Sequence, residues 1–414
     1  MSHRVTRFAA IATASVVAVA TVVIGGGGSS FTGTSAGASA TPFRMMIDAP
    51  ISSAALAANA TTAVNAAKAA VKVINKSGGV LGHKIVLTVS DDGGSPTTAV
   101  TKLEAAINSG NKPNVYLAAA ASDMSAAVLP ILTQNKIISM NEAPTATSGQ
   151  PSVDPYNFDL SPSTTNYAEA FCPYVKAKGG KSVAILHGND AYGDPLALAM
   201  QAACTADGVT VTGVQQFATT SLDMTAQLEA LKAGNPDYLL LQAYGAPAGY
   251  IMQDIQKIGW NVPILGDDSV SVSAVINEAP PTGFLGTSLL NNLLVQTFAC
   301  TVYQPPAKQS AALNNMINGM KSFGPITTTL ILAYMYDGVV LASYGAKSAK
   351  TTTNAAAIAK AIVKLKPGGP PTGVFPAYHF TSASHSPNVA VSAFSFTKVT
   401  KVINGQFGAP GSGA

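Results

Sequence analysis

Apolar and polar positions along the chain switch between the period of strands and the period of helices. A short apolar run, Phe43 to Asp48, precedes an alanine-rich stretch, Ala54 to Asn75, whose apolar positions have helical spacing. Lys84 to Ser90 then alternates apolar and polar residues, as a strand does. Ser95-Pro96 places a capping hydroxyl before proline at the first position of a helix expected from Thr97 to about Ser109. The pattern therefore predicts a strand–helix–strand–helix order at the start of the fold.

The same alternation continues along the next half of the chain. Further strands are expected at 115–119, 137–140, 182–187, 209–215, 238–242 and 263–265. The helices expected between them are 125–134, 194–207, 224–233 and 246–259. A βαβα order favours parallel sheets with helices on both faces, so the sequence predicts an α/β fold.

Two interruptions of this alternation indicate two domains. Residues 145–163 are rich in Pro, Ser, Thr and Asp and have little periodicity, as expected of a crossing between domains. A second change comes near residues 278–283, and helices are expected after it at 308–321, 327–346 and 354–365. The tail, 377–405, is predicted to form antiparallel strands with a turn at 384–388. We expect one lobe to comprise 41–160 plus 291–376, and the other 161–290 plus 377–408.

The first forty residues predict export. Arg4 and Arg7 precede a largely apolar run without charge, and a small-residue stretch ends in Ala38-Ser39-Ala40, which is typical of a signal peptide cleaved after Ala40. The alternative is an uncleaved anchor, because the apolar run is only slightly shorter than the ~18 to 20 residues that span a bilayer. No cysteine follows the run, so a lipid-attachment residue is missing. The mature protein is expected to work outside the cytoplasm, where disulfides are stable.

Composition narrows the class of protein further. Of the 414 residues, 47% are hydrophobic, which excludes a disordered chain. Only 11% are charged, against a usual ~25%. The 24 basic and 20 acidic residues give a net charge of +4, too small for a protein that binds nucleic acid by neutralising phosphates.

A ligand site is expected in the loops that follow the strands. In open parallel sheets, ligands bind beyond the carboxyl ends of the strands, and these loops carry hydroxyls, single aromatic residues and acids. Helix N-termini there would suit a carboxylate and an acid would suit an ammonium, which together favour a zwitterion. The alternative is a purely structural role, in which Ser122 and Asp268 only cap helices and Tyr192 and Tyr244 only pack at loop ends.

Signatures of catalysis or of cofactors are missing. The strand-to-helix loops carry neither a Gly-x-Ser-x-Gly sequence nor a phosphate loop ending in Gly-Lys-Ser/Thr, and the chain has no His-Glu-x-x-His. His379 and His385 flank the predicted turn without a cysteine or acid at ligand spacing. We therefore expect no enzyme activity, no metal and no cofactor.

Four segments resemble one known family in their order and spacing. These are Ile74 to Ile85, Asp91 to Val100, His187 to Gly193 and Leu265 to Asp268. Together they resemble the type I periplasmic binding proteins, and most closely the branched-chain amino acid receptors of ABC importers. The similarity covers most of Phe43 to about Lys398.

The resemblance implies two lobes that are joined by a multi-strand hinge and close on a small ligand. It implies a monomer that binds an amino acid or an analogue and delivers it to an ABC permease in the membrane. The matching ligand contacts are Ser122 for the carboxylate, Asp268 for the α-ammonium, and also Ala143, Thr145, Tyr192 and Tyr244. The family usually has glutamate in place of Asp268, and the aromatic residue of its first loop is missing from Ala49 to Ser53.

The three cysteines allow one bridge. Cys172 and Cys204 lie on the helices predicted before and after the strand 182–187, so a disulfide is expected between them if both helices cover one face. Cys300 would then be free; the alternative is three buried thiols.

Two other functions stay open on the sequence. One is a sensory or regulatory small-molecule binding protein of the same fold. The other is a secreted hydrolase, since a fold does not determine a function.

Overall fold

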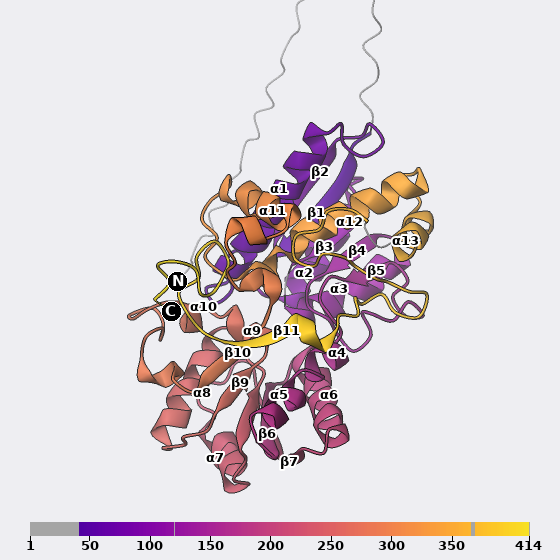
Figure 1. The fold of residues 1–414 in the computed structure, drawn as a ribbon. Coiled ribbons are helices and arrows are strands. Elements are labelled where there is room, and N and C mark those ends of the chain that lie inside the picture. The colour runs from indigo at the N-terminus through magenta and orange to yellow at the C-terminus, as the bar shows by residue number, and fades with distance from the viewer. Residues whose placement is uncertain (1–40, 120, 366–368, 414) are drawn as a thin grey trace, which may run out of the picture. The chain divides into compact units, whose positions relative to one another are not determined.

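The computed structural model describes residues 41–119, 121–365 and 369–413. The predicted export segment, 1–40, lies outside the described residues. The described chain forms two sheets, each covered by helices, with helices α1 to α13 and strands β1 to β11 in chain order (Figure 1).

The first sheet has five parallel strands in the order β2-β1-β3-β4-β5. Its strands are β1 (Phe43–Ala49), β2 (Ile85–Asp91), β3 (Val115–Ala118), β4 (Ile138–Asn141) and β5 (Asn157–Asp159). All residues of β3, β4 and β5 are buried, as expected of parallel strands covered on both faces.

The second sheet has six strands in the order β11-β10-β9-β8-β6-β7. They are β6 (Ser182–Gly188), β7 (Thr210–Phe217), β8 (Tyr238–Leu241), β9 (Ile264–Gly266), β10 (Leu293–Phe298) and β11 (Phe394–Lys398). Strands β6 to β10 pair in parallel, whereas β11 pairs antiparallel with β10, so the edge strand comes from the other end of the sequence (Figure 1).

Helices from distant parts of the sequence cover the first sheet. One face carries α1 (Ala57–Lys76), α11 (Ala311–Lys321), α12 (Tyr334–Ala349) and α13 (Ala355–Val363). The other face carries α2 (Pro96–Asn108) and α3 (Ser122–Gln134), where Met46 and Tyr116 of the sheet pack against Leu103 and Val128. Helices thus cover both faces of the inner strands, whereas the edge strand β2 keeps several exposed residues.

The second sheet is covered in the same way. One face carries α4 (Thr164–Ala168), α5 (Phe171–Ala177) and α6 (Gly193–Ala206). The opposite face carries α7 (Thr225–Ala233), α8 (Ala246–Lys257), α9 (Asp268–Ser271) and α10 (Ala274–Asn277).

Local sequence signals begin and end the helices. The Ser95 hydroxyl accepts from the N–H of Thr98 at 3.3 Å, with Pro96 at the first position of α2, as predicted. After α1 the chain turns at Gly79, where a Cβ atom would lie 2.1 Å from the carbonyl oxygen of His83. Only glycine allows this close approach of two backbone segments.

The predicted α/β class with parallel-rich sheets is confirmed, but three elements differ. Helix α3 begins at Ser122, earlier than the expected Ser125. Strand β5 lies inside the stretch predicted to have no periodicity, because two of its three residues, Asn157 and Asp159, are polar and yet fully buried. Strand β10 has no counterpart in the prediction, although Leu293–Phe298 is an apolar run typical of a buried strand. It belongs to the second sheet, although it lies within 291–376, a stretch that the sequence predicts in the first lobe.

The predicted antiparallel strands of the tail are wrong except for β11. The segment 377–390 forms no strand. Near His385 it bonds to β5 and to the carbonyl of Gly149, and at Val389 it bonds to Asn166 of α4. The N–H of Asp159 donates to the carbonyl of His385 at 2.9 Å, and the His385 ring stacks on Phe158 with centroids 4.2 Å apart. The tail therefore covers the β5 edge before it returns to the second sheet as β11.

Cys172 on α5 and Cys204 on α6 form a disulfide, with Cα atoms 5.2 Å apart. The two helices cover the same face of β6, which is the arrangement that the sequence predicts. The thiol of Cys300 is free and buried.

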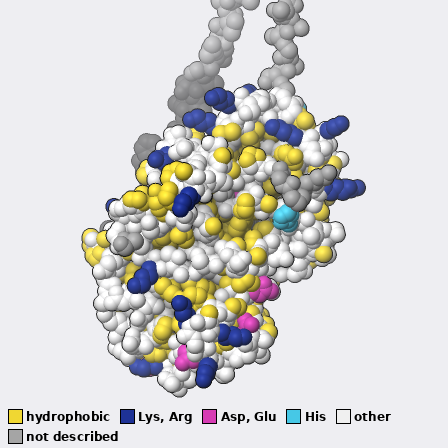
Figure 2. Space-filling view, in the orientation of Figure 1, with side chains coloured by type: hydrophobic (Ala, Val, Ile, Leu, Met, Phe, Trp, Pro, Cys, Tyr) yellow, Lys and Arg dark blue, Asp and Glu magenta, His cyan; other side chains and the backbone are white. Residues whose placement is uncertain are grey.

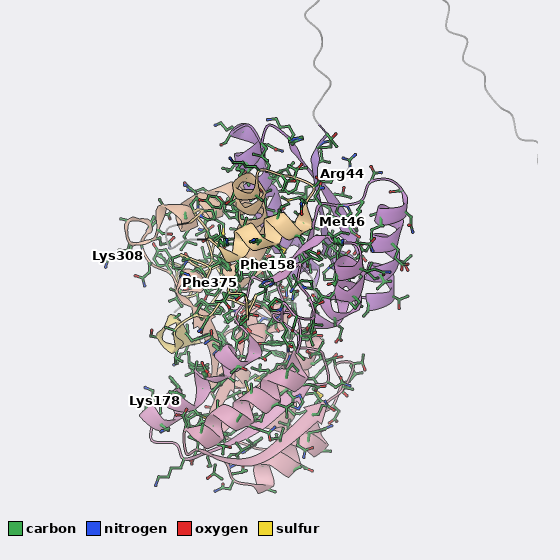
Figure 3. All side chains as sticks on the ribbon, turned by 90° about the vertical axis from the view of Figure 1, so that its right-hand side faces the viewer. Arg44, Met46, Phe158, Lys178, Lys308 and Phe375 are labelled. Atoms are coloured by element: carbon green, nitrogen blue, oxygen red, sulfur yellow. A yellow bond between two sulfur atoms is a disulfide. The ribbon has the colours of Figure 1, made fainter. Side chains whose placement is uncertain are left out.

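The large aromatic side chains lie mostly inside the protein, and the lysines lie mostly on its surface. Phe158 and Phe375 lie in the packed interior, whereas Lys178 and Lys308 project outward (Figure 3). The face in Figure 2 is mostly uncharged, with scattered lysines and few acids. Among the described residues, no helix combines the length and the apolar character that a membrane span requires.

Candidate functional site

A cavity of about 110 Å³ lies beyond the carboxyl ends of both sheets. Its walls come from the loops after β1, β3 and β4 of the first sheet and after β6, β8 and β9 of the second. Each sheet reverses its strand order at this edge, β1 to β3 in one and β6 to β8 in the other, which is where ligands bind in open α/β sheets.

Five of the six ligand contacts implied by the resemblance line this cavity. They are Ser122, Ala143, Tyr192, Tyr244 and Asp268. Thr145 is not among the lining residues. Its hydroxyl accepts from the N–H groups of Thr147 and Ser148, so in this structure it stabilises a turn instead.

Asp268 is a buried acid held by two tyrosines. Its side chain accepts from the hydroxyl of Tyr167 at 2.6 Å and from that of Tyr192 at 3.2 Å. Burial raises the pKa of Asp268 to about 6, because desolvation disfavours the carboxylate. No cationic side chain lines the cavity among the described residues, so the negative charge of Asp268 has no fixed counterion there.

Asp267 fixes the backbone next to Asp268. It is the N-cap of α9, and its carboxylate accepts from the hydroxyl of Ser269 at 2.6 Å and from the N–H of Val270 at 3.4 Å. Burial and the charge of Asp268 both raise the pKa of Asp267. The cap thus places Asp268 at the first position of a helix that begins at the cavity wall.

Ser122 opens α3, whose N-terminus faces the cavity. Its N-cap residue, Ala121, makes no side-chain hydrogen bond to the helix, so the first N–H groups lack a side-chain cap. The Ser122 hydroxyl donates to Asp190 at 3.3 Å, and Asp123 accepts from the N–H of Ala191 at 2.9 Å. These two bonds join a loop of the first sheet to a loop of the second.

A polar network holds the loop after β4. The Asn141 amide donates to the carbonyl oxygen of Ala143 at 2.8 Å and to Asp159 at 2.9 Å, and its oxygen accepts from Ser125 at 2.8 Å. Asp159 also accepts from Asn157, Ser148 and Ser386. Asp159 therefore positions the loop that carries Ala143 into the cavity wall.

Replacing Asp159 with alanine should destabilise the protein. The change leaves four buried donors without their acceptor, and each buried unsatisfied polar group costs roughly 1 to 3 kcal/mol. We expect a loss of about 3 kcal/mol or more in the free energy of unfolding, measured by urea denaturation. Asp159→Asn, which keeps one acceptor oxygen, should lose less, and Asp223→Ala on the surface should lose little. An unchanged urea midpoint for Asp159→Ala would contradict the role given to this network.

Six polar residues of the cavity wall are not among the ligand contacts expected from the sequence: Asn59, Glu142, Tyr167, Asp190, Ser269 and Tyr334. Glu142 directly follows β4, in a loop that is a candidate by position, so its place in the chain was a usable signal. Tyr167 lies on α4, a five-residue helix too short to show periodicity, and Tyr334 begins α12 within a predicted helix. Only the fold brings these two tyrosines to the cavity.

The cavity also has an apolar part. Leu56 of the segment before α1, Val272 after α9, and Ile331 and Leu332 before α12 line it beside the polar groups. Such a site can hold a small ligand by one charged end and pack a short apolar stem.

Comparisons with known proteins agree with this architecture. The model of the family described as periplasmic binding protein matches residues 49–401. The Leu/Ile/Val-binding protein homolog 3 of Brucella melitensis is 27% identical over 304 residues, which cover 73% of this chain and 78% of that protein.

Solved structures show the same fold. A periplasmic binding protein type 1 from Bordetella pertussis superposes with a TM-score of 0.73 at 20% identity, covering 88% of this chain and 97% of the other. The branched-chain amino acid transporter substrate-binding protein of Streptococcus pneumoniae, solved with isoleucine, superposes with a TM-score of 0.70 at 18% identity, covering 89% and 98%.

Proposed function

The chain belongs to the periplasmic binding protein family, and on that premise we propose that it is the extracytoplasmic solute-binding protein of an ABC importer for an amino acid or a close analogue. Proteins of this family bind ligands and are not enzymes, and we extend that role to this chain. The observation that carries the proposal is Asp268, a buried acid without a cationic side chain among the described residues of the cavity wall. An α-ammonium would supply the missing counterion.

The same cavity offers a place for the carboxylate of the ligand. The N-terminus of α3, which has no side-chain cap, offers N–H donors from the first sheet's side of the cavity. The Ser122 hydroxyl, which donates to Asp190 in this structure, would turn to the carboxylate when the ligand binds. The hydroxyls of Tyr192 and Tyr244 add neutral groups, and the backbone at Ala143 adds a further polar wall. A zwitterion bound here has one end on each sheet.

Ligand contacts from both sheets support a closing motion. We propose that each sheet with its helices is one lobe and that the lobes move about the segments that connect them. A ligand that contacts both lobes makes more contacts when they are closed, and it therefore shifts the population toward the closed form. The closed monomer would then dock on the membrane permease after export directed by residues 1–40.

A thermal-shift screen over amino acids, amides and short carboxylates tests the function. We expect at least one α-amino acid to raise the melting temperature, because a ligand that binds only the folded state stabilises it. Ser122→Ala should weaken the binding of that amino acid about ten-fold, the cost of one hydrogen bond to a charged group. Ser109→Ala, at the exposed end of α2, is the matched control. Failure of every amino acid to shift the melting temperature would reject the proposed function.

A further inference from the structure

Glu142 is a second acid in the wall of the same cavity. One of its carboxylate oxygens, Oε2, is buried and has no hydrogen-bond partner among the described residues. A buried polar atom without a partner is costly, and native proteins rarely keep one without a functional reason. The side chain is thus in place for a group that the protein itself does not supply.

The backbone of Glu142 is held, so the side chain is not placed there by a loose loop. Its N–H donates to the carbonyl of Ala118 on β3 at 3.1 Å. The residues on either side, Asn141 and Ala143, are bonded to one another through the Asn141 amide. Glu142 is therefore presented from a rigid strand end, as a preorganised binding residue would be.

Asp268 and Glu142 do not share hydrogen-bond partners. The hydroxyls of Tyr167 and Tyr192 bond to Asp268, whereas Glu142 Oε2 receives no bond from the described residues. Burial and the charge of Asp268 both raise the pKa of Glu142, so the charged form of Glu142 is disfavoured unless a cation lies beside it. A ligand with a single ammonium group would neutralise the charge of only one of these two acids.

We propose that the ligand carries a second amino group and that Glu142 binds it. This inference rests on the proposed function and specifies its ligand as a diamino acid rather than one with a purely apolar side chain. The α-ammonium lies on Asp268 and the side-chain ammonium on Glu142, in a cavity whose described wall has no lysine, arginine or histidine. The third acid of the wall, Asp190, already accepts from the N–H groups of Tyr192 and Gly193. Leu56, Ile331 and Leu332 are left to pack the methylene stem between the two groups.

Isosteric ligand pairs test this inference without any change to the protein. Ornithine and norleucine differ only by an ammonium in place of a terminal methyl group, and diaminobutyrate and norvaline form a shorter pair of the same kind. By isothermal titration calorimetry at neutral pH, we expect the diamino member of at least one pair to bind at least about ten-fold more tightly than its apolar partner.

Glu142→Gln then locates the effect. It should weaken binding of the preferred diamino acid by about ten-fold or more and change binding of its apolar partner less than about three-fold. Glu229→Gln, the same substitution on the exposed face of α7, should change neither. Binding of the apolar partner also shows that the variant is folded.

Different negative results would overturn this inference and the proposed function. If norleucine and norvaline both bind as tightly as their diamino partners, or if Glu142→Gln weakens both members of the preferred pair equally, the second amino group is wrong while the proposed function stands. If no amino acid binds, the proposed function is wrong and this inference is wrong with it.

Discussion

Asp268→Asn should abolish most amino-acid binding, with an expected loss of about 100-fold in affinity. The amide has nearly the same shape and can accept from one of the two tyrosine hydroxyls, which donate to different oxygens of Asp268, but it cannot neutralise an α-ammonium in a buried site. Calorimetry with the amino acid that gives the largest thermal shift measures the effect. Asp223→Asn, which changes an exposed acid just before α7, is the control. Affinity that falls less than about three-fold would remove Asp268 from the ligand contacts.

The same substitution should stabilise the ligand-free protein at neutral pH. Burial raises the pKa of Asp268 from 3.8 to about 6, so the folded state binds a proton that the unfolded state has already lost. The contribution of this group to stability is therefore greatest below about pH 4 and is lost as the pH rises to about 6. The melting temperature of Asp268→Asn should rise relative to that of the original protein between about pH 4 and about pH 6, and it should stay higher above pH 6. Asp159, whose pKa is also about 6, contributes equally to both curves and cancels in the difference.

Replacing Cys172 and Cys204 together with alanine should cost about 4 kcal/mol of stability in the chain-entropy model, because the disulfide closes a loop across a sequence separation of 32. We expect a lower urea midpoint for the double variant, and a similar fall when the original protein is reduced. The bridge holds α5 and α6 together over β6. In the double variant, which lacks the bridge, the second sheet should therefore unfold before the first.

Cys300→Ala provides the control for the bridge. It removes the buried thiol and keeps the disulfide, so reduction should still destabilise this variant. Non-reducing peptide mapping should recover one crosslinked pair of peptides that contain Cys172 and Cys204. A double variant as stable as the original protein would contradict a structural role for the bridge.

The sequence predicted the elements whose signals are local. Helix α2 begins where Ser95 and Pro96 indicate, and the strands of both sheets up to β9 lie within a few residues of their predicted positions, apart from β5. The loops after these strands also pointed to the cavity, because parallel strands bring their carboxyl ends to one edge.

Features that depend on distant partners were missed. Strand β5 is polar because Asp159 accepts bonds from residues as far away as Ser386. Tyr167 reaches Asp268 across about a hundred positions of sequence, and no local pattern indicates such a pair. Thr145 shows the opposite error, since a match to a family motif placed it in the site, whereas its bonds are within a turn.

The order in which the strands occur along the chain also limits when the molecule can fold. Helices α11 to α13, which cover one face of the first sheet, are made of residues 311–363, and the edge of the second sheet is closed by β11 at 394–398. A chain that emerges N-terminus first therefore holds both halves incomplete until nearly its whole length is available. Long-range pairing of this kind folds slowly. If residues 1–40 direct export as proposed, this delay would keep the chain unfolded while it crosses the membrane. A chain that is truncated before residue 394 would leave the second sheet with an open edge at β10.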